Sequence, residues 1–237
     1  MSKTFRALLD SLGVRPRKTA ANRGVRQLLL ALDRFGVDLV LDVGANVGQF
    51  AREIRTFGYP GRIVSFEPLE DAHRRLGEAA AGDGAWRVHP RCAIGDSDGE
   101  VAINVSANSV SSSLLPMTDA HAGAAGGSAY VRRETVPSFR LDSVAAPYLA
   151  AAKSPFLKID TQGFEWQVLD GAAQSLPRLR GLLCELSLVE LYSGQRLWLD
   201  VLARLEAAGF TLWNLQPGFA DPRDGRTLQL DAVLFRL

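Results

Sequence analysis

Short apolar runs alternate with amphipathic helical segments from Leu39 almost to the end of the chain. Runs of this length suit buried strands, and strands that alternate with helices are typical of a parallel sheet covered on both faces. The sequence therefore predicts an α/β fold. We expect strands at 39–44, 62–68, 86–95, 156–160, 181–187, 211–216 and 228–237, and helices at 50–58, 70–82, 140–151, 165–176 and 197–210.

Two stretches lie outside this alternation. The turn "GDSDG" leads to "EVAINVSA" at 100–107, which predicts an extra strand added to the preceding one as a hairpin. The tract at 108–133 is rich in serine, alanine and glycine, and it is longer than most connections in a compact domain. We expect this tract to be either a disordered linker or a flap over a site.

The length and charge of the chain narrow its class. With 237 residues, of which 47% are hydrophobic and 22% charged, it has the composition of a soluble protein with one sizeable core. A formal net charge of +1 gives no general attraction to nucleic acid or to an anionic membrane. No apolar segment has the length of a signal peptide core or a membrane span. We therefore expect a cytoplasmic protein without stable membrane insertion, in which Cys92 and Cys184 are reduced packing residues.

The first 37 residues are expected to form an N-terminal helical segment ahead of a main domain at 38–237. Seven lysines and arginines stand against a single acid within the first 27 residues. Such a basic amphipathic start could contact lipid or an acidic partner, although a solvated lid helix is the favoured interpretation. Apolar residues recur at helical spacing from Val25 to Leu32, so this part of the segment is expected to pack beside the sheet.

The sequence "VLDVGANVGQF" at 40–50 joins the first strand to the next helix. Gly44 and Gly48 remove side chains where a ligand would approach, and the helix that follows directs free N–H groups toward that point. In doubly wound sheets, ligands bind beyond the carboxyl ends of the strands. A dinucleotide site would need the spacing GxGxxG, but this turn reads GxNxG, which weakens the case for a pyrophosphate.

Two acids at adjoining strand ends indicate the kind of ligand. Asp42 would repel a phosphate but would accept hydrogen bonds from an ammonium group. Glu67 stands at the end of the next strand, where α/β folds place an acid that binds both ribose hydroxyls. S-adenosylmethionine has an ammonium group and a ribose but no phosphate, so it satisfies both acids. The alternative is a structural turn with an incidental acid at each strand end.

Seven motifs occur in order from about Val40 to Phe235, namely "DVGANVGQF", "SFEP", "AIGDSDG", "SVSSSL", "KIDTQGFEWQVLDG", "ELSLVELYSG" and "QLDAVLF". Together they resemble the FkbM family of S-adenosylmethionine-dependent methyltransferases. The glycine turn is shared by many class I methyltransferases, whereas "KIDTQGFE" is far more specific. The resemblance would make 38–237 a methyltransferase domain.

The resemblance implies a fold and an activity. The fold is the class I methyltransferase (Rossmann-like) fold, a seven-stranded, mostly parallel sheet with helices on both faces and the last strand antiparallel. The activity is O-methylation of a hydroxyl, typically on a sugar or a polyketide-type natural product, with S-adenosylhomocysteine as the second product.

The resemblance also implies a set of cofactor-binding residues. By position, Asp42, Gly44, Asn46 and Gly48 would line the methionine part, Glu67 the ribose, and Ala93 with Ile94 the adenine region. Ala45, Pro68 and Asp160 complete the expected cofactor-binding set.

The strand at 156–160 carries charges that a central parallel strand would normally lack. Lys158 and Asp160 are two residues apart in "FLKID", so they lie on one face, and Glu185 adds a third ionisable group in the next strand. A structural ion pair of Lys158 with Asp160 or Glu185 is one interpretation. A catalytic role is the other, and the two can coexist.

Methyl transfer from a sulfonium requires an aligned acceptor oxygen and help in removing its proton. Asp160 is the residue predicted to orient or deprotonate the acceptor hydroxyl, and Glu185 is the second candidate. His121, in the tract at 108–133, is the third, because an ordinary pKa of about 6.5 suits a general base. The residues expected to contact the substrate are Gln162, Glu165, Trp166 and Tyr192, with a place in the core as the alternative for the two aromatic residues.

Asp160 and Glu185 could also hold Mg²⁺, but the sequence offers no clear third ligand, so no metal site is predicted. The expected partner is a small-molecule hydroxyl acceptor and not a nucleic acid. Two alternative functions remain. One is a nucleic-acid methyltransferase, for which the chain beyond its amino terminus lacks clear basic or aromatic tracks, and the other is a non-catalytic cofactor-binding module of the same fold.

Overall fold

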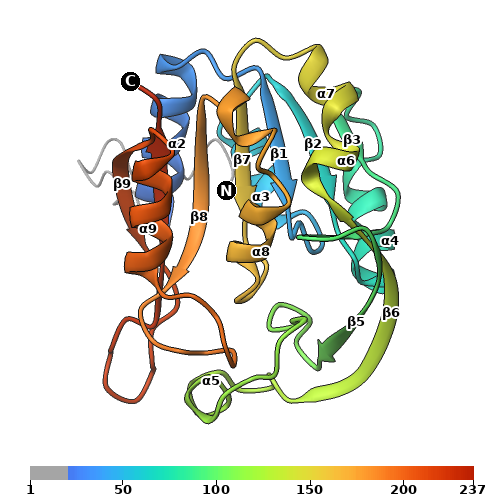
Figure 1. Ribbon diagram of the computed structural model, residues 1–237, viewed down its shortest axis with the longest axis vertical. Helices are drawn as coiled ribbons and strands as arrows, with labels where there is room; N and C mark the ends of the chain where they lie inside the picture. The colour runs from blue at the N-terminus through green and yellow to red at the C-terminus, as the bar shows by residue number, and fades with distance from the viewer. Residues whose placement is uncertain (1–20) are drawn as a thin grey trace, which may run out of the picture.

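A seven-stranded sheet forms the centre of the structure, a computed structural model that describes residues 21–237 (Figure 1). In spatial order the strands are β3 (Trp86–Val88), β2 (Arg62–Phe66), β1 (Leu39–Val43), β7 (Pro155–Ile159), β8 (Gly181–Ser187), β10 (Gln229–Phe235) and β9 (Thr211–Pro217). The first five are parallel, and β10 is antiparallel to both of its neighbours. The expected mostly parallel sheet with an antiparallel last strand is confirmed.

Helices cover both faces of this sheet, as the alternating sequence predicts. Every residue of β1 and of β7 is buried, which explains why these strands are apolar on both sides except at Asp42 and Lys158. One face packs against α2 (Ala21–Arg34), α3 (Gln49–Thr56) and α4 (Glu70–Ala80). The other packs against α6 (Leu141–Val144), α7 (Ala146–Ala150), α8 (Glu165–Asp170), the 3₁₀ helix η1 (Leu176–Arg178) and α9 (Trp198–Ala207).

The strand order fixes where a ligand can bind. From β1 the chain proceeds to β2 and β3 on one side, and it later returns to β7 and β8 on the other side. The order of the strands therefore reverses between β1 and β7. In folds of this kind the crevice beyond the carboxyl ends of the two strands at the reversal is the usual ligand site.

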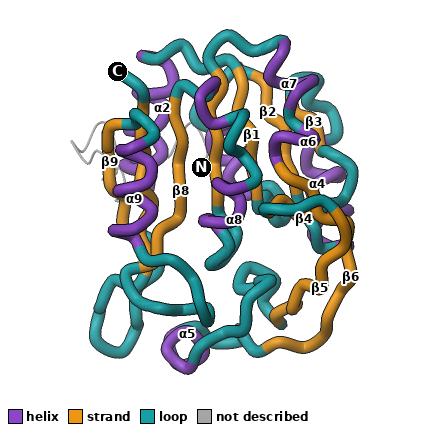
Figure 2. Tube along the Cα trace, viewed as in Figure 1, coloured by secondary structure: helices purple, strands orange, loops and turns teal. Residues whose placement is uncertain are grey.

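A smaller sheet extends beyond the carboxyl ends of the parallel strands of the main sheet (Figures 1 and 2). Its strands, in spatial order, are β4 (Ala93–Gly95), β6 (Tyr130–Arg140) and β5 (Gly99–Ser106). The segment 107–129 joins β5 to β6 and contains α5 (Asp119–Ala124). We call this segment the flap. It is docked on the main domain, because the Ser113 hydroxyl donates a 2.7 Å hydrogen bond to the carbonyl oxygen of Gln162.

Two strand predictions in this region are wrong. The single strand expected at 86–95 is divided between two sheets, with β3 in the main sheet and β4 in the smaller one. Pro90 lies between them, and its ring and missing N–H prevent an unbroken ladder. The strand at 100–107 does not pair with the strand before it, because β6 lies between β4 and β5.

The segment after the flap also differs from its prediction. Residues 130–140 form β6, an eleven-residue strand. Residues 130–133 were expected in the linker or flap tract and a helix was expected from residue 140, with no element predicted between them. The helix expected at 140–151 is two short helices, α6 and α7, and Pro147 stands in the first turn of the second. Proline is favoured in a first turn and cannot continue a preceding helix, which accounts for the division.

The amino-terminal segment is described from residue 21 onward. Val25, Leu28 and Leu32 of α2 are buried in the same apolar cluster as strand residues Val40 and Phe156, so the helix packs beside the sheet as expected. The basic residues expected in a lid helix before residue 21 lie outside the described part, and the boundary between residues 37 and 38 stays a prediction. Within residues 21–237 no helix is long and apolar enough to cross a membrane.

Candidate active site

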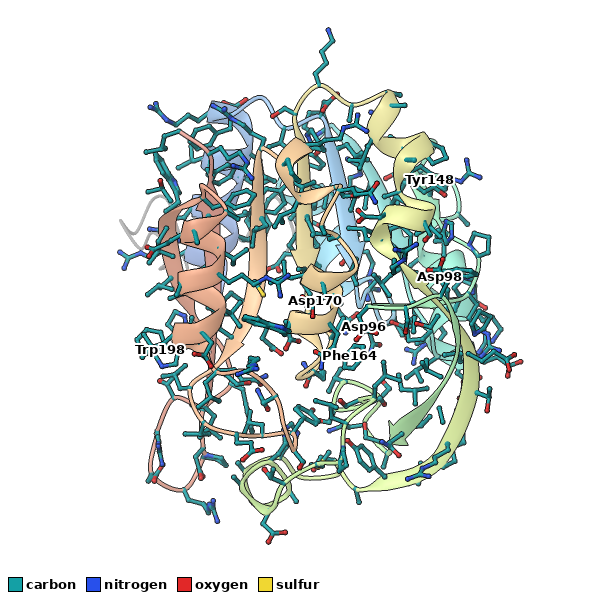
Figure 3. All side chains as sticks on the ribbon, viewed as in Figure 1. Asp96, Asp98, Tyr148, Phe164, Asp170 and Trp198 are labelled. Atoms are coloured by element: carbon teal, nitrogen blue, oxygen red, sulfur yellow. The ribbon has the colours of Figure 1, made fainter. Side chains whose placement is uncertain are left out.

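A cavity of about 580 Å³ lies at the carboxyl ends of β1, β2, β7 and β8, beneath the flap. This volume falls within the roughly 300–1,000 Å³ that is usual for small-molecule pockets. Its walls come from the turn after β1, the ends of β2 and β7, and flap residues between Asn108 and Ala125. Phe164 also lines it, and this side chain lies just below α8, where the main domain faces the flap (Figure 3).

The turn after β1 has a backbone that only certain residues tolerate. Gly44, Asn46 and Gly48 have φ angles of 74°, 47° and 82°, which lie in the left-handed region. A Cβ atom on Gly44 would overlap the carbonyl oxygen of Asp160, and one on Gly48 would come within 2.7 Å of the Trp86 ring. The glycines therefore allow close packing of the turn against β7 and β3, and Gly44 and Asn46 also line the cavity.

Replacing Gly44 with alanine should destabilise the protein more than the same change at Gly36. Both residues have positive φ, so both variants carry a left-handed backbone cost of about 1–2 kcal/mol. Only Gly44 adds a collision, because nothing lies within 4 Å of a Cβ at Gly36. We expect Gly44→Ala to lose about 1–3 kcal/mol more than Gly36→Ala. Urea unfolding measures both, and equal losses would contradict the close packing of the turn on Asp160.

Glu67 connects the end of β2 to this turn. Its carboxylate accepts hydrogen bonds from the backbone N–H groups of Asn46, at 2.7 Å, and Leu69, at 2.9 Å. Burial raises the pKa of Glu67 to about 7, although the two N–H donors act in the opposite direction. Each carboxylate oxygen has two lone pairs, so Glu67 retains acceptor capacity toward the cavity that it lines.

Asp42 has a different place from the one expected. It is fully buried and does not line the cavity, because its carboxylate accepts a 3.0 Å hydrogen bond from Ser65 and pairs with Lys158 at 3.2 Å. Lys158 lines the cavity instead, and it also donates to the carbonyl oxygen of Gly44 at 2.9 Å and approaches Asp160 at 3.4 Å. Asp42 therefore acts on the cavity through Lys158.

The charge of Lys158 is maintained by its neighbours. Burial alone would lower the pKa of Lys158, but the carboxylates of Asp160 and Asp42 raise it above its ordinary value. The ammonium group is thus kept protonated between the turn after β1 and the end of β7. Of the two ion pairs considered for Lys158, the one with Asp160 is present and the one with Glu185 is not found among the described residues, whereas Asp42 is a partner that was not expected.

Replacing Lys158 with methionine should lower the free energy of unfolding by about 3–5 kcal/mol, because it leaves the buried Asp42 carboxylate without its cation. Chemical denaturation checks this. The control is Lys153→Met, at an exposed lysine just before β7, for which we expect a change within about 0.5 kcal/mol. The double variant Lys158→Met with Asp42→Asn should recover part of the loss. A double variant as unstable as the single one would exclude the unpaired charge as the cause.

Asp160 and Glu185 are brought together by an amide group. The Gln162 side-chain N–H₂ group donates to Asp160 at 2.9 Å and to Glu185 at 2.8 Å, and its carbonyl oxygen accepts from the Tyr192 hydroxyl at 2.8 Å. Gln229 donates a further 2.8 Å hydrogen bond to Glu185. This network fixes two of the predicted catalytic carboxyl groups on the wall of one cavity.

His121, the third predicted catalytic residue, also lines the cavity. It belongs to α5 of the flap and is only 2% exposed, and neither ring nitrogen has a hydrogen-bond partner within the described residues. Its ring centroid lies 5.0 Å from that of Tyr192 and 5.7 Å from that of Phe219. Burial lowers the pKa of His121, which favours a neutral imidazole that can both donate and accept a hydrogen bond.

Three of the four residues expected at the substrate do not line the cavity, and only Gln162 does. Glu165 instead accepts hydrogen bonds from the Thr161 and Gly163 backbone N–H groups at the start of α8. Trp166 packs on the apolar core, with the Arg204 guanidinium 4.4 Å from its ring centroid. Tyr192 is fully buried behind Gln162. Each of these side chains has structural partners, and the core alternative describes the two aromatic residues.

Eight of the ten expected cofactor-binding residues line the cavity, and the two that do not are Asp42 and Gly48. The eight are Gly44, Ala45, Asn46, Glu67, Pro68, Ala93, Ile94 and Asp160. The sequence reasoning missed Asp231, Gln229 and Phe164 as lining residues. The sequence did hold a signal for Asp231, because it is an acid within the apolar run "QLDAVLF". The structure places it opposite Glu185 in the strand pair.

The acids of the cavity do not form a metal cluster. Among residues 21–237, no group of three or more histidine, cysteine, aspartate or glutamate side chains is arranged to hold a metal ion. Cys92 and Cys184 are both free and buried, as expected for packing residues.

Comparison with known proteins identifies a related family. The sequence pattern of the methyltransferase FkbM domain matches residues 42–212. This range includes the turn after β1, Glu67, the flap and the network around Gln162 except Gln229. A search of curated proteins finds no match.

Several solved structures resemble the chain at low sequence identity. One is EvdMO1, at 13% identity and a TM-score of 0.43, over 90% of this chain and 39% of that one. Another is the Burkholderia thailandensis 1,6-didemethyltoxoflavin-N1-methyltransferase with S-adenosylhomocysteine, at 16% identity and 0.47, over 99% and 85%. A third is Aeropyrum pernix fibrillarin with S-adenosyl-L-methionine, at 13% identity and 0.43, over 89% and 76%. The chain thus spans less than half of the EvdMO1 chain.

Proposed function

Because the chain belongs to the methyltransferase FkbM family, we propose that it transfers a methyl group from S-adenosylmethionine to a hydroxyl of a small molecule. The acceptor in this proposal is a sugar, a glycoside or a polyketide-type natural product. One observation carries the proposal: the turn after β1, Glu67 and Asp160 line a single cavity that the flap covers.

The residues of the cavity fit this cofactor. Glu67 presents carboxylate oxygens one strand away from the turn after β1, the relation that a ribose site needs. The described lining residues include five acids and one lysine, which suits a cationic ligand without phosphate. The five acids are Glu53, Glu67, Asp160, Glu185 and Asp231.

S-adenosylmethionine, when bound, would supply the methyl group of its sulfonium to the acceptor oxygen, with S-adenosylhomocysteine as the leaving group. Asp160 accepts the hydroxyl proton or orients the hydroxyl, because its side chain is 36% exposed and faces the cavity. Gln162 holds Asp160 in place relative to Glu185. Phe164 and the flap exclude water from the reacting atoms.

A nucleic-acid methyltransferase is the weaker alternative. Binding of a phosphodiester chain depends on lysine and arginine contacts to phosphate. Lys158 is the one such residue among the described lining residues, and its charge is already paired with Asp42 and Asp160. The acid-rich wall would repel phosphate, so the charge of the cavity favours a small acceptor.

Two measurements in sequence test the proposal. Calorimetric titration with S-adenosylmethionine and S-adenosylhomocysteine should show one site for each compound. Transfer of an isotope-labelled methyl group to a panel of glycosides and polyketide alcohols should then yield a methyl ether. Absence of binding would remove the cofactor from the proposal. Binding without transfer to any member of a broad panel would favour the non-catalytic module.

A further inference from the structure

Glu185 on β8 and Asp231 on β10 form an acidic pair at one end of the cavity. The two residues are directly opposite each other in the antiparallel register, and both line the cavity. Among residues 21–237, the hydrogen bonds to the Glu185 carboxyl group come from neutral amides, namely those of Gln162 and Gln229, each at 2.8 Å. The Asp231 carboxyl group has no hydrogen-bond partner within the part of the chain that the structure describes. The pair is therefore not neutralised by a direct contact with a cation of the described chain.

Lys158 does not supply the missing charge. Its ammonium group lies within ion-pair distance of Asp42 and Asp160, at 3.2 Å and 3.4 Å. Lys158 is the single lysine or arginine among the described lining residues. Burial and the neighbouring carboxylates, Asp160 foremost, raise the pKa of Glu185 well above its ordinary value, and they raise that of Asp231 to about 6. These shifts have the direction expected of buried acids that lack a counter-charge.

In the proposed arrangement the ammonium group of the cofactor lies at the turn after β1 and not at the acidic pair. The residues assigned to the cofactor follow β1 and β2 or lie on β4, apart from Asp160, which follows β7. The amino-acid part is assigned to the turn after β1, and β8 and β10 are two and three strands from β1 in the sheet order. At about 4.8 Å per strand, the pair is displaced from β1 by roughly 10 and 14 Å. The acidic pair therefore belongs to the acceptor part of the cavity.

A second, independent feature indicates that a polar ligand occupies this part. His121 of the flap is buried and lines the same cavity, and both of its ring nitrogens lack a partner within residues 21–237. A buried imidazole without partners costs free energy unless a ligand satisfies it. His121 also packs on Tyr192, whose hydroxyl donates to Gln162. Through Tyr192 and Gln162, the imidazole is thus linked to Glu185 of the acidic pair.

From these contacts we infer that the acceptor of the proposed methyl transfer carries a basic amine, which Glu185 and Asp231 bind as an ammonium group. His121 forms a hydrogen bond with another polar group of the same molecule. The inference rests on the proposed function and adds the substrate class, an amino sugar or a similar amino alcohol. An ammonium group has three N–H donors, which matches two facing carboxyl groups and leaves one donor for a further contact.

The test compares charged and neutral ligands of nearly the same shape. The probes are methyl glucosides in which one hydroxyl at a time is replaced by an amine, with the parent methyl glucoside as the neutral reference. Nuclear magnetic resonance titration measures their affinity for the protein loaded with S-adenosylhomocysteine at neutral pH. We expect at least one amine to bind about tenfold or more tightly than the parent glucoside, as a charge-assisted hydrogen bond would give.

The variants Glu185→Gln and Asp231→Asn keep the side-chain shape and remove the charge. Each should therefore bring the ratio of the amine affinity to the parent glucoside affinity close to one. The control Asp200→Asn, at an exposed acid of α9 that does not line the cavity, should leave the preference unchanged. The inference is overturned if no amine binds, if the parent glucoside binds as tightly as every amine, or if the preference survives in Glu185→Gln.

The outcome is separable from that of the proposed function. A protein that binds S-adenosylhomocysteine but shows no amine preference removes the inference and leaves the proposed function in place. A protein that does not bind S-adenosylhomocysteine removes the proposed function and the acceptor inference with it, and an amine preference of the unliganded protein would then show only that Glu185 and Asp231 bind an ammonium group.

Discussion

Replacing Asp160 with asparagine should lower kcat by about 10²–10⁴-fold while the affinity for S-adenosylmethionine changes little. Asparagine keeps the size of the side chain and can still contact Gln162 and Lys158, but it cannot accept a proton. General-base assistance accounts for an effect of this size. The fold should survive the change, because Lys158 retains Asp42 as a buried partner. The measurement is a pair of values for each protein, kcat from methyl transfer and Kd from calorimetry.

The matched control for this change is Asp170→Asn. Asp170 lies on α8, ten positions further along the chain (Figure 3). It forms a 2.8 Å ion pair with Arg204 and does not line the cavity. The Asp170→Asn variant should have kcat and Kd values close to those of the wild type. A wild-type kcat in Asp160→Asn would remove Asp160 from the chemical step. A large loss of cofactor affinity with little change in kcat would instead make it a binding residue.

Replacing Glu67 with alanine should weaken S-adenosylhomocysteine binding by about 10²-fold or more. Two hydroxyl groups that donate to one carboxylate are charge-assisted hydrogen bonds, each of about 1.5–3 kcal/mol. The change also removes the acceptor for the Asn46 and Leu69 N–H groups, so part of the loss could come from a looser turn. A ligand without one ribose hydroxyl separates the two causes.

The loss of affinity caused by Glu67→Ala should therefore be about tenfold smaller for 2′-deoxy-S-adenosylhomocysteine than for the full compound. The deoxy ligand lacks one hydroxyl, so it cannot form one of the two hydrogen bonds with either protein. Calorimetry of the two ligands with the two proteins gives this comparison. Glu70→Gln, at an exposed acid in the first turn of α4, is the control and should not alter either affinity. Equal losses for both ligands would show that Glu67 acts only on the turn.

Much of the fold could be predicted because strands that are buried on both faces have mostly apolar sequences. The parallel strands read as unbroken apolar runs, and the helices between them keep a helical period. The smaller sheet was not predictable in the same way. Its strand β6, "YVRRETVPSFR", has mostly partly or fully exposed residues and includes a proline, so it lacks both the apolar run and a clean alternation. Its partner β5 is distant in sequence, and only tertiary pairing determines it.

The site followed the same division. Residues fixed by backbone geometry were predictable, because a left-handed backbone conformation favours glycine or asparagine. Gly44 and Asn46 both have this conformation in the turn at the end of β1. The roles of charged residues were harder to predict, because the sequence does not show which acid forms an ion pair with a buried lysine. Asp42 was expected to contact the ligand, yet Lys158 occupies its carboxylate. Asp231 was overlooked because its importance depends on its place opposite Glu185 in the sheet.

A crystal structure of the protein grown with S-adenosylhomocysteine tests the central claim most directly. The account predicts the compound in the cavity beneath the flap, with its ribose hydroxyls on Glu67, its amino-acid part at the turn after β1 and its sulfur facing Asp160. Density for the compound elsewhere, or an empty cavity at saturating concentration, would contradict the assignment of this cavity as the methyl-transfer site.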